Sequence, residues 1–185
     1  MCENVWLLPL KNLDDDARAI KLGEIAELEV GTDQRNFVGD PLRMMLVALE
    51  EESRYPFAVD SNGTAVGVLT LQSGAASLAG WRDDDSVWLL RGFLIDRRQQ
   101  GKGLGTLAAV AAVREAARLT TALAGRQAGV VLSVNEVNPA GLAAYRKAGF
   151  EDHGQYLGGA AGPQRTMFCS FPARDASRPG SPETT

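Results

Sequence analysis

Cysteine, histidine and excess positive charge are all scarce in this 185-residue sequence. Neither of the 2 cysteines, Cys2 and Cys169, belongs to a C-x-x-C or Cys/His cluster. We therefore expect no disulfide framework and no zinc or other metal site. The formal net charge of −4 argues against a nucleic-acid partner, because such proteins neutralise phosphates over a broad basic surface.

Long apolar runs are also missing, since no uninterrupted apolar stretch is long enough to span a bilayer. The N-terminal stretch MCENVWLLPLKNLDDD has no basic region and too short an apolar run for a signal peptide. We expect a cytoplasmic protein with no membrane partner. The composition, 45% hydrophobic, suits one globular domain over residues 1–171, followed by a disordered, Pro/Ser-rich tail over 172–185.

Apolar periodicity and turn residues predict an α/β fold with a mixed sheet. Asp40 and Pro41 mark one helix start, the DSNG turn at 60–63 marks a hairpin, and Gly149 marks a helix end. We expect strands at residues 5–10, 55–60, 64–72, 86–96, 128–135, 152–157 and 165–171. Helices are expected at 13–28, 41–52, 104–123 and 139–150, and a loop at 73–85.

The stretch QQGKGLGT, residues 99–106, lies between a predicted strand and a predicted helix. Its glycines at 101, 103 and 105 would let an anionic ligand approach the backbone amides and the positive end of the helix dipole. The spacing matches neither the G-x-G-x-x-G dinucleotide fingerprint nor the G-x-x-x-x-G-K-[ST] loop. A tight turn of small residues is the alternative, but one glycine usually suffices for such a turn. The stretch therefore predicts a phosphate-binding loop.

The segment Gln100–Gly105 resembles the [Q/R]-x-x-G-x-[G/A] acetyl-CoA signature of the GNAT superfamily of N-acetyltransferases. A second segment, LSVNEVNPAGLAAYRKAGF, is similar to the later motif of that superfamily, with Asn138, Tyr145 and Gly149-Phe150 at matching positions. The two motifs occur in the expected order, and the resemblance runs from about residue 5 to 171. It implies a mainly antiparallel sheet of about six to seven strands, splayed between two central parallel strands and flanked by about four helices.

The resemblance implies that acetyl-CoA is the co-substrate and that a primary amine attacks it directly in a ternary complex. The loop amides would receive the pyrophosphate, the backbone of 93–95 would pair with the pantetheine arm, and Asn138 would bond to that arm. The residues expected to bind acetyl-CoA are Phe93, Leu94, Ile95, Gln100, Gly101, Lys102, Gly103, Leu104, Gly105, Thr106, Asn138 and Tyr145.

Tyr145 resembles the general acid of the superfamily, which protonates the departing thiolate. The alternative for this tyrosine is core packing with its hydroxyl at the rim. Asp96 is the only carboxylate on the strand before the loop and is our candidate for the general base. His153, the only histidine, is expected at the surface, and nothing near Cys169 indicates a nucleophile.

The segments 29–72 and WLLRGFLIDRRQQGKGLG (88–105) resemble bacterial diamine and spermidine/spermine acetyltransferases, which implies a small polyamine-like or related amine as acceptor. The matching positions are Gln34, Phe37, Val38, Tyr55, Pro56 and Gly67. The usual aromatic residue after Gly67 is Val68 here, and the RDDD and GGAAGPQ stretches also depart from the pattern. A cationic acceptor would favour carboxylates at the mouth of the site. The candidates, chosen only because they are acidic, are Glu27, Glu29, Asp33, Asp83, Asp84 and Asp85.

Several alternatives stay open at this point. The acceptor could be an antibiotic or another metabolite amine, or a protein or peptide amine. A CoA-binding sensor or interaction module without chemistry is a non-enzymatic alternative, because a fold does not guarantee an activity. A nicotinamide-dependent reductase would bind NADH instead of acetyl-CoA. Relatives of this kind often form homodimers, so a homodimer is a further expectation.

Overall fold

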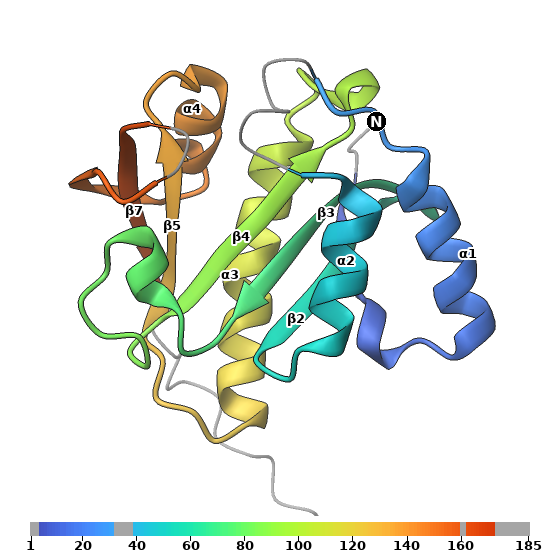
Figure 1. Ribbon diagram of the computed structural model, residues 1–185, viewed down its shortest axis with the longest axis horizontal. Coiled ribbons are helices and arrows are strands. Elements are labelled where there is room, and N and C mark those ends of the chain that lie inside the picture. Colours follow the sequence, from blue (N-terminus) through green and yellow to red (C-terminus); the bar gives the residue numbers. More distant parts are fainter. Residues whose placement is uncertain (1–3, 32–38, 160–161, 173–185) are drawn as a thin grey trace, which may run out of the picture.

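A computed structural model describes residues 4–31, 39–159 and 162–172 (Figure 1). One mixed sheet has the strand order β1-β2-β3-β4-β5-β7-β6. Its strands are β1 (Trp6–Pro9), β2 (Arg54–Ser61), β3 (Thr64–Gln72), β4 (Trp88–Ile95), β5 (Gly129–Asn135), β6 (Glu151–Tyr156) and β7 (Gln164–Ser170). The helices are α1 (Asp15–Ala26), α2 (Pro41–Glu50), α3 (Leu104–Ala122) and α4 (Pro139–Lys147). The predicted α/β fold is confirmed.

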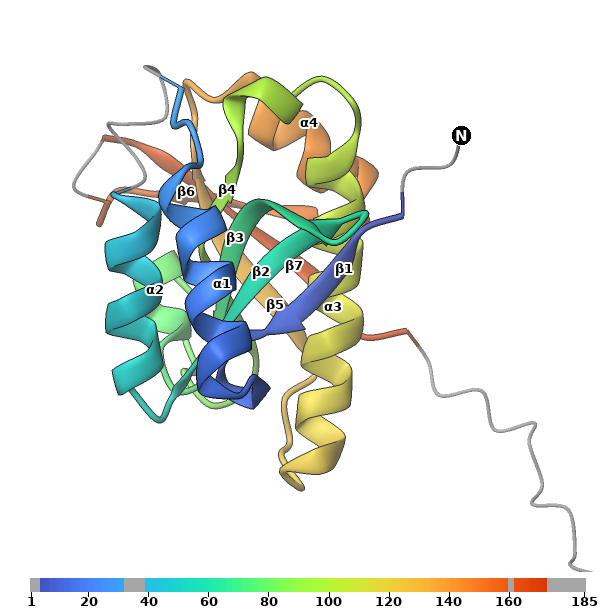
Figure 2. The same cartoon turned by 90° about the vertical axis from the view of Figure 1, so that its right-hand side faces the viewer.

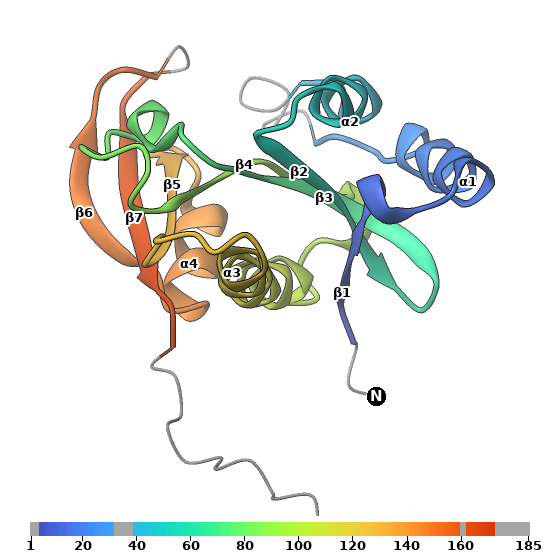
Figure 3. The ribbon, with the colours of Figure 1, turned by 90° about the horizontal axis from the view of Figure 1, so that it is seen from below.

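Helices cover both faces of the sheet, α1 and α2 on one side and α3 and α4 on the other (Figure 3). Alanines at 108, 109, 112 and 116 recur at helical spacing and are fully buried, so α3 lies close against the strands. The buried indole of Trp88 on β4 donates a hydrogen bond of 2.7 Å to Thr120 Oγ1. These contacts fix the position of α3 relative to β4, and therefore that of the loop between them.

The parallel strands β4 and β5 pair only near their beginnings, at Trp88–Val130 and Leu89–Val131. Beyond that point the two strands diverge, as Figure 1 shows. On its other edge β4 carries a bulge, because Gly92 and Phe93 together face the single residue Leu69 of β3. Gly92 has φ of 57°, a conformation that favours glycine. A bulge bends a strand and increases its twist, which fits the divergence of β4 from β5.

Several predicted boundaries are confirmed by their local geometry. Asp40 accepts a hydrogen bond of 2.7 Å from the Arg43 amide at the start of α2. Asn62 and Gly63 form the hairpin turn with φ of 55° and 85°. Gly149 follows α4 with φ of 94°. Each of these positions carries a residue type whose chemistry suits its turn or cap, which is why the sequence located it.

The stretch 73–85, predicted as a loop, contains a short 3₁₀ helix, η2 (Ala76–Ala79). The carboxylate of Asp84 accepts hydrogen bonds from the amide and the hydroxyl of Ser77, which holds η2 against the following turn. Apart from Pro172, the predicted tail lies outside the described residues, as do Asp33, Gln34, Phe37 and Val38. Within the described chain, no helix has both the length and the apolar character to cross a membrane.

Candidate active site

The glycine loop joins the end of β4 to α3 and has an unusual backbone. Gly101 and Gly103 have φ of 79° and 82°, and nothing lies within 4 Å of the position that a Cβ would take at either residue. The first hydrogen bond into α3 runs from the Leu107 amide to the Gly103 carbonyl. The amides of Leu104, Gly105 and Thr106 therefore have no acceptor within the helix. Open space over free amides at a helix N-terminus suits a phosphate group.

A cleft of about 320 Å³ opens beside this loop, on the face of the sheet that α3 and α4 cover. Figure 2 shows α4 near the N-terminal end of α3, and the Thr106 hydroxyl donates to the Ala144 carbonyl at 3.4 Å. We call this cavity the loop cleft. The predicted residues that line it are Phe93, Ile95, Gln100, Gly101, Gly103, Leu104, Gly105, Thr106, Asn138 and Tyr145.

Two residues predicted to bind the cofactor do not line the loop cleft. The Leu94 side chain is 1% exposed and packs on the opposite face of the sheet, so only its backbone can serve the loop cleft. Lys102 donates a hydrogen bond of 2.6 Å to Gln99 Oε1 and does not line the cleft. Lys147, which the sequence reading missed, does line it. No local pattern in the sequence distinguishes it from Arg146, the other basic residue in the last turn of α4.

The Tyr145 ring lines the loop cleft and packs against two other aromatic rings. Its centroid lies 6.0 Å from that of Phe93 and 5.7 Å from that of Phe150. Among the described residues its hydroxyl has no hydrogen-bond partner, so it is free to donate to a ligand. Burial raises the pKa of the phenol above its ordinary value. The phenol therefore stays protonated at neutral pH, as a proton donor requires.

Asn138 begins α4 and serves it as a cap. Its Oδ1 accepts a hydrogen bond of 2.9 Å from the Gly141 amide. The side-chain amide nitrogen is not needed for this cap, and the residue lines the loop cleft. Asn138 can therefore cap α4 and donate a hydrogen bond to a ligand at the same time.

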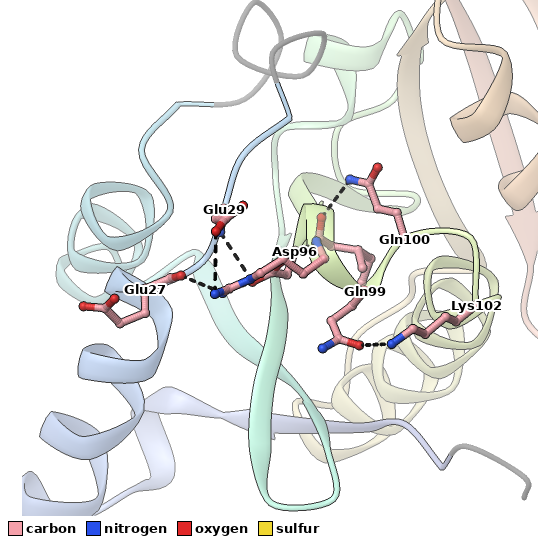
Figure 4. Close-up of polar contacts among 8 residues, drawn as sticks. Glu27, Glu29, Asp96, Gln99, Gln100 and Lys102 are labelled. Carbon is pink, nitrogen blue, oxygen red and sulfur yellow. Dashed lines mark hydrogen bonds and ion pairs between the residues drawn. The ribbon is translucent and has the colours of Figure 1, made fainter.

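Asp96 requires a correction, because its surroundings do not suit a general base (Figure 4). The residue is 2% exposed, pairs with the Arg98 guanidinium, and accepts hydrogen bonds from the amides of Arg98 and Glu29. Burial alone raises the pKa of the Asp96 carboxyl, but the hydrogen bonds from Arg98 and Glu29 outweigh it and lower the pKa. A buried carboxylate with a lowered pKa and a bound arginine is a poor proton acceptor.

The same group of contacts ties the end of β4 to the segment after α1. The Arg98 guanidinium donates to the Glu27 carbonyl at 2.8 Å, and the Arg97 amide donates to the Glu29 carbonyl at 2.9 Å. Arg98 and the Glu29 carboxylate are 3.7 Å apart. Asp96 therefore acts as a structural link that holds the start of the glycine loop.

The predicted acidic mouth at Asp83–Asp85 is a second correction. These residues precede β4, whereas the glycine loop follows it, and eight residues of strand span roughly 26 Å. Asp83 accepts from the Asp85 amide at 3.0 Å, and Asp84 binds Ser77, so both carboxylates stabilise the local turn. None of the three lines the loop cleft or the larger cleft described next. Glu29 lines another hollow, beside Asp40, and stays a candidate substrate residue.

A larger cleft, of about 870 Å³, lies on the opposite face of the sheet. We call it the α2 cleft, because α2 forms one wall and the β6–β7 side of the sheet, including Tyr156 and Gln164, forms another. Its floor includes Leu90, Arg91 and Gly92 of β4. The charged side chains that line it are Asp40, Arg43, Arg54 and Arg91.

His153 and Cys169 take no part in either cleft. His153 is exposed on the edge strand β6, as predicted, and its ring packs on Trp81 at 5.2 Å between centroids. Burial, followed by the charge of Glu151, raises the pKa of the Cys169 thiol, which reduces the fraction of reactive thiolate. No group of three or more His, Cys, Asp or Glu residues that could hold a metal occurs within residues 4–31, 39–159 and 162–172.

A splayed parallel pair with a glycine loop at its open end, and clefts on both faces, define the architecture of an acetyltransferase. The sequence agrees, because a family model described as "Acetyltransferase (GNAT) family" matches residues 22–150. The chain belongs to this family. A search of curated proteins gave no significant match.

Solved structures with the same fold include an AAC(6′)-Ib complex with paromomycin and acetyl-CoA. It is 21% identical, with a TM-score of 0.66, and the alignment covers 97% of this chain and 99% of that chain. A spermidine N-acetyltransferase SpeG chimera from Vibrio cholerae and hSSAT is 16% identical, with a TM-score of 0.61 and coverage of 90% and 94%. At these identities the similarity establishes the fold.

Proposed function

We propose that this protein transfers an acetyl group from acetyl-CoA to the primary amine of a small molecule, by direct attack in a ternary complex. The observation that carries the proposal is that neighbouring residues of β4 line the two clefts. Gly92 lines the α2 cleft and Phe93 lines the loop cleft, at the level where β5 has diverged from β4. A carrier in one cleft and an acceptor in the other would therefore meet between the two strands.

The loop cleft fits acetyl-CoA, which the related AAC(6′)-Ib complex contains. The amides of Leu104, Gly105 and Thr106 would hold the pyrophosphate, over glycines that leave its approach open. Beyond Leu89 the edge of β4 that faces β5 has no strand partner, so the backbone at 93–95 would pair with the pantetheine arm. Acetyl-CoA would supply the activated acetyl group as a thioester.

Tyr145 is the residue that we assign to proton transfer. Tyr145 lines the loop cleft beside Phe93, and burial keeps its hydroxyl protonated. From this position it would donate its proton to the sulfur that leaves when the amine attacks. A positioned donor stabilises the leaving group only as charge develops, so it acts on turnover more than on binding.

Deprotonation of the amine needs a different acceptor from Asp96. Asp40 is the one carboxylate among the described residues that line the α2 cleft, and it already caps α2. The cleft is wide enough to hold water, which can carry the proton to solvent. We therefore assign this step to water in the α2 cleft.

The class of amine that serves as acceptor is less sharply defined. The resemblance in 29–72 and 88–105 and the SpeG fold favour a polyamine, and the AAC(6′)-Ib fold favours an aminated antibiotic. The described lining of the α2 cleft has three arginines and one carboxylate. Such a lining disfavours polycations of either kind, so we keep only the broader class, a small primary amine. Cytoplasmic location and homodimer formation stay predictions.

A turnover screen tests the proposal. Purified protein is mixed with acetyl-CoA and a panel of amines, and both free thiol and acetylated product mass are measured. We expect amine-dependent thiol release that is matched by product. Thermal melting with acetyl-CoA, CoA and NADH serves as the binding control, since a ligand of the native state raises stability. The proposal fails if no amine is acetylated, or if NADH stabilises the fold more than acetyl-CoA does.

A further inference from the structure

Arg91 is a charged residue in the middle of an otherwise apolar central strand, WLLRGFLI. Its register partner Thr70 also lines the α2 cleft, so the guanidinium side chain belongs to the floor of this cleft. Its Nη1 donates a hydrogen bond of 2.9 Å to Gln72 Oε1. Across residues 4–31, 39–159 and 162–172, no carboxylate lies within 4.0 Å of Arg91. A half-buried cation therefore faces the cleft with only a neutral amide as its side-chain partner.

Arg54 adds a second positive charge to the same floor. It pairs in register with Gln72, the residue that binds Arg91, and its side chain is 19% exposed. Its Nε lies 2.9 Å from Glu51, which does not line the cleft. Arg43 on α2 contributes a third guanidinium at the exposed wall.

The arrangement is electrostatically costly for the fold. Burial lowers the pKa of Arg91, and the charge of Arg54 lowers it further, against a smaller opposing effect of Glu51. Glu51 pairs with Arg54, whereas Arg91 has no carboxylate partner among the described residues, so an anion bound at Arg91 would reduce the repulsion between the two guanidinium groups. Arginine is also the side chain best suited to bind planar oxyanions with two parallel hydrogen bonds.

We propose that the acceptor carries an oxyanion, a carboxylate or a phosphate, in addition to its amine, and that Arg91, supported by Arg54 and Arg43, binds that oxyanion in the α2 cleft. This inference rests on the proposed function, because it names the class of acceptor. Arg91 is followed by Gly92, which also lines the α2 cleft, and by Phe93, which lines the loop cleft. An acceptor anchored at Arg91 would hold its amine close to the acetyl group.

The phosphates of acetyl-CoA are not the partners of these arginines. None of Arg43, Arg54 or Arg91 lines the loop cleft, where the free amides of the glycine loop lie. The two anion-binding regions face opposite sides of the sheet. Acetyl-CoA affinity and acceptor preference should therefore respond to different substitutions.

The test compares amines that differ only in their second group. One set holds ω-amino acids from glycine to 6-aminohexanoate, the second their carboxamides, and the third the matching diamines. Phosphoethanolamine and ethanolamine form a separate pair that distinguishes phosphate from carboxylate. Rates at saturating acetyl-CoA give kcat/KM for each compound. We expect the best oxyanion compound to exceed its neutral counterpart at least ~10-fold, which is within the range for hydrogen bonds to a charged group.

Arg91→Gln is the matching variant, because it removes the charge and keeps a polar side chain next to Gln72. We expect it to reduce the preference for the oxyanion at least ~10-fold and to leave the affinity for acetyl-CoA unchanged. Arg114→Gln makes the same change in net charge at an exposed site on α3, across the sheet, and should change neither quantity. Circular dichroism and thermal melting confirm that both variants are folded.

Several outcomes would overturn the inference. If carboxamides or diamines are acetylated as well as the oxyanion compounds, the inference fails and the proposed function stands. The same holds if Arg91→Gln leaves the preference unchanged. If no compound of any set is acetylated although acetyl-CoA binds, the proposed function fails and the inference falls with it.

Discussion

The two clefts, which Gly92 and Phe93 line from neighbouring positions of β4, take their binding groups from different parts of the chain. The loop cleft takes its binding groups from the backbone, mainly from one continuous stretch, Gly101–Thr106, and from the start of α4. The α2 cleft takes them from side chains on α2, β2, β4 and β7, which are distant in sequence. The loop cleft therefore suits a ligand that is the same for every acceptor, whereas single substitutions in the α2 cleft can change which acceptor binds.

This difference has consequences for mutation. Backbone amides cannot be removed by substitution, so the loop cleft is damaged only by residues that obstruct it or distort it. The α2 cleft is open to change at each side chain. Tyr145 lines the loop cleft, but the group that we assign to proton transfer is its side chain and not the backbone. It should therefore be the single residue whose loss affects turnover most.

Tyr145→Phe is expected to have the largest effect. The ring and its packing on Phe93 and Phe150 remain, and only the hydroxyl is lost. We expect kcat to fall about 100-fold, and at least ~10-fold if water partly replaces the acid. The Michaelis constant for acetyl-CoA should hardly change, because the lost interaction exists mainly in the transition state.

Steady-state kinetics with acetyl-CoA and the best amine of the screen measure the effect of Tyr145→Phe. Tyr55→Phe removes the same hydroxyl at a residue that lines neither cleft, and it should keep full turnover. An increase in the Michaelis constant alone would make Tyr145 a cofactor contact. No change in either parameter would make it a packed rim residue.

Gly103→Val should weaken acetyl-CoA binding at least ~10-fold, since a branched side chain would fill the space over the free amides and distort the loop. Gly63→Val is the matched control. Gly63 has φ of 85° against 82° for Gly103, and both positions are open, so the backbone strain is the same. Calorimetry with CoA and acetyl-CoA should show lost affinity for the first variant only. Near-normal affinity would place the phosphates elsewhere.

Asp96→Asn should affect stability and leave the chemistry unchanged. The pKa of Asp96 is lower in the folded protein than the ordinary 3.8, so its carboxylate stabilises the fold above that value, and the contribution is lost as the pH falls through the folded pKa. At neutral pH the variant should lose about 1–3 kcal/mol in free energy of unfolding. The difference from the wild type should shrink below about pH 4.

Urea unfolding at both pH values measures the stability effect, and a pH profile of kcat measures the chemistry. We expect the profile of Asp96→Asn to keep the shape of the wild-type profile. A loss of turnover of about 100-fold or more in the folded variant would restore Asp96 as the general base.

Lys147→Gln should have the smallest effect. Lys147 lies at the exposed edge of the loop cleft, where an ion pair with a phosphate is screened by solvent. We expect acetyl-CoA to bind about two- to fivefold more weakly at low salt, with the difference lost at high salt. Arg146→Gln, on the neighbouring residue outside the cleft, should have no effect on affinity. An effect that persists in high salt would mean a direct, desolvated contact.

Local chemistry along the chain determined the turns, the helix ends and the carrier-binding loop of this protein. The helix caps, the hairpin at Asn62 and Gly63, and the glycine loop could be predicted because each depends on a few adjacent residues. The motif around Tyr145 could be placed in the same way. A turn that needs a positive φ, or a helix start that needs free amides, leaves a visible pattern of glycine, proline and aspartate.

Only the tertiary structure decided the roles of the charged residues. A sequence shows that Asp96, Asp83 and Arg91 carry charge, but not which charge or amide faces each of them. In the structure Asp96 forms an ion pair with Arg98, and Asp84 of the acidic turn accepts a hydrogen bond from Ser77. Arg91 lines the α2 cleft. Electrostatic roles depend on distances and burial set by residues far apart in the chain, such as Glu29 for Asp96 and Arg54 for Arg91. For that reason the carrier could be predicted from the sequence, whereas our proposal for the acceptor rests on the fold.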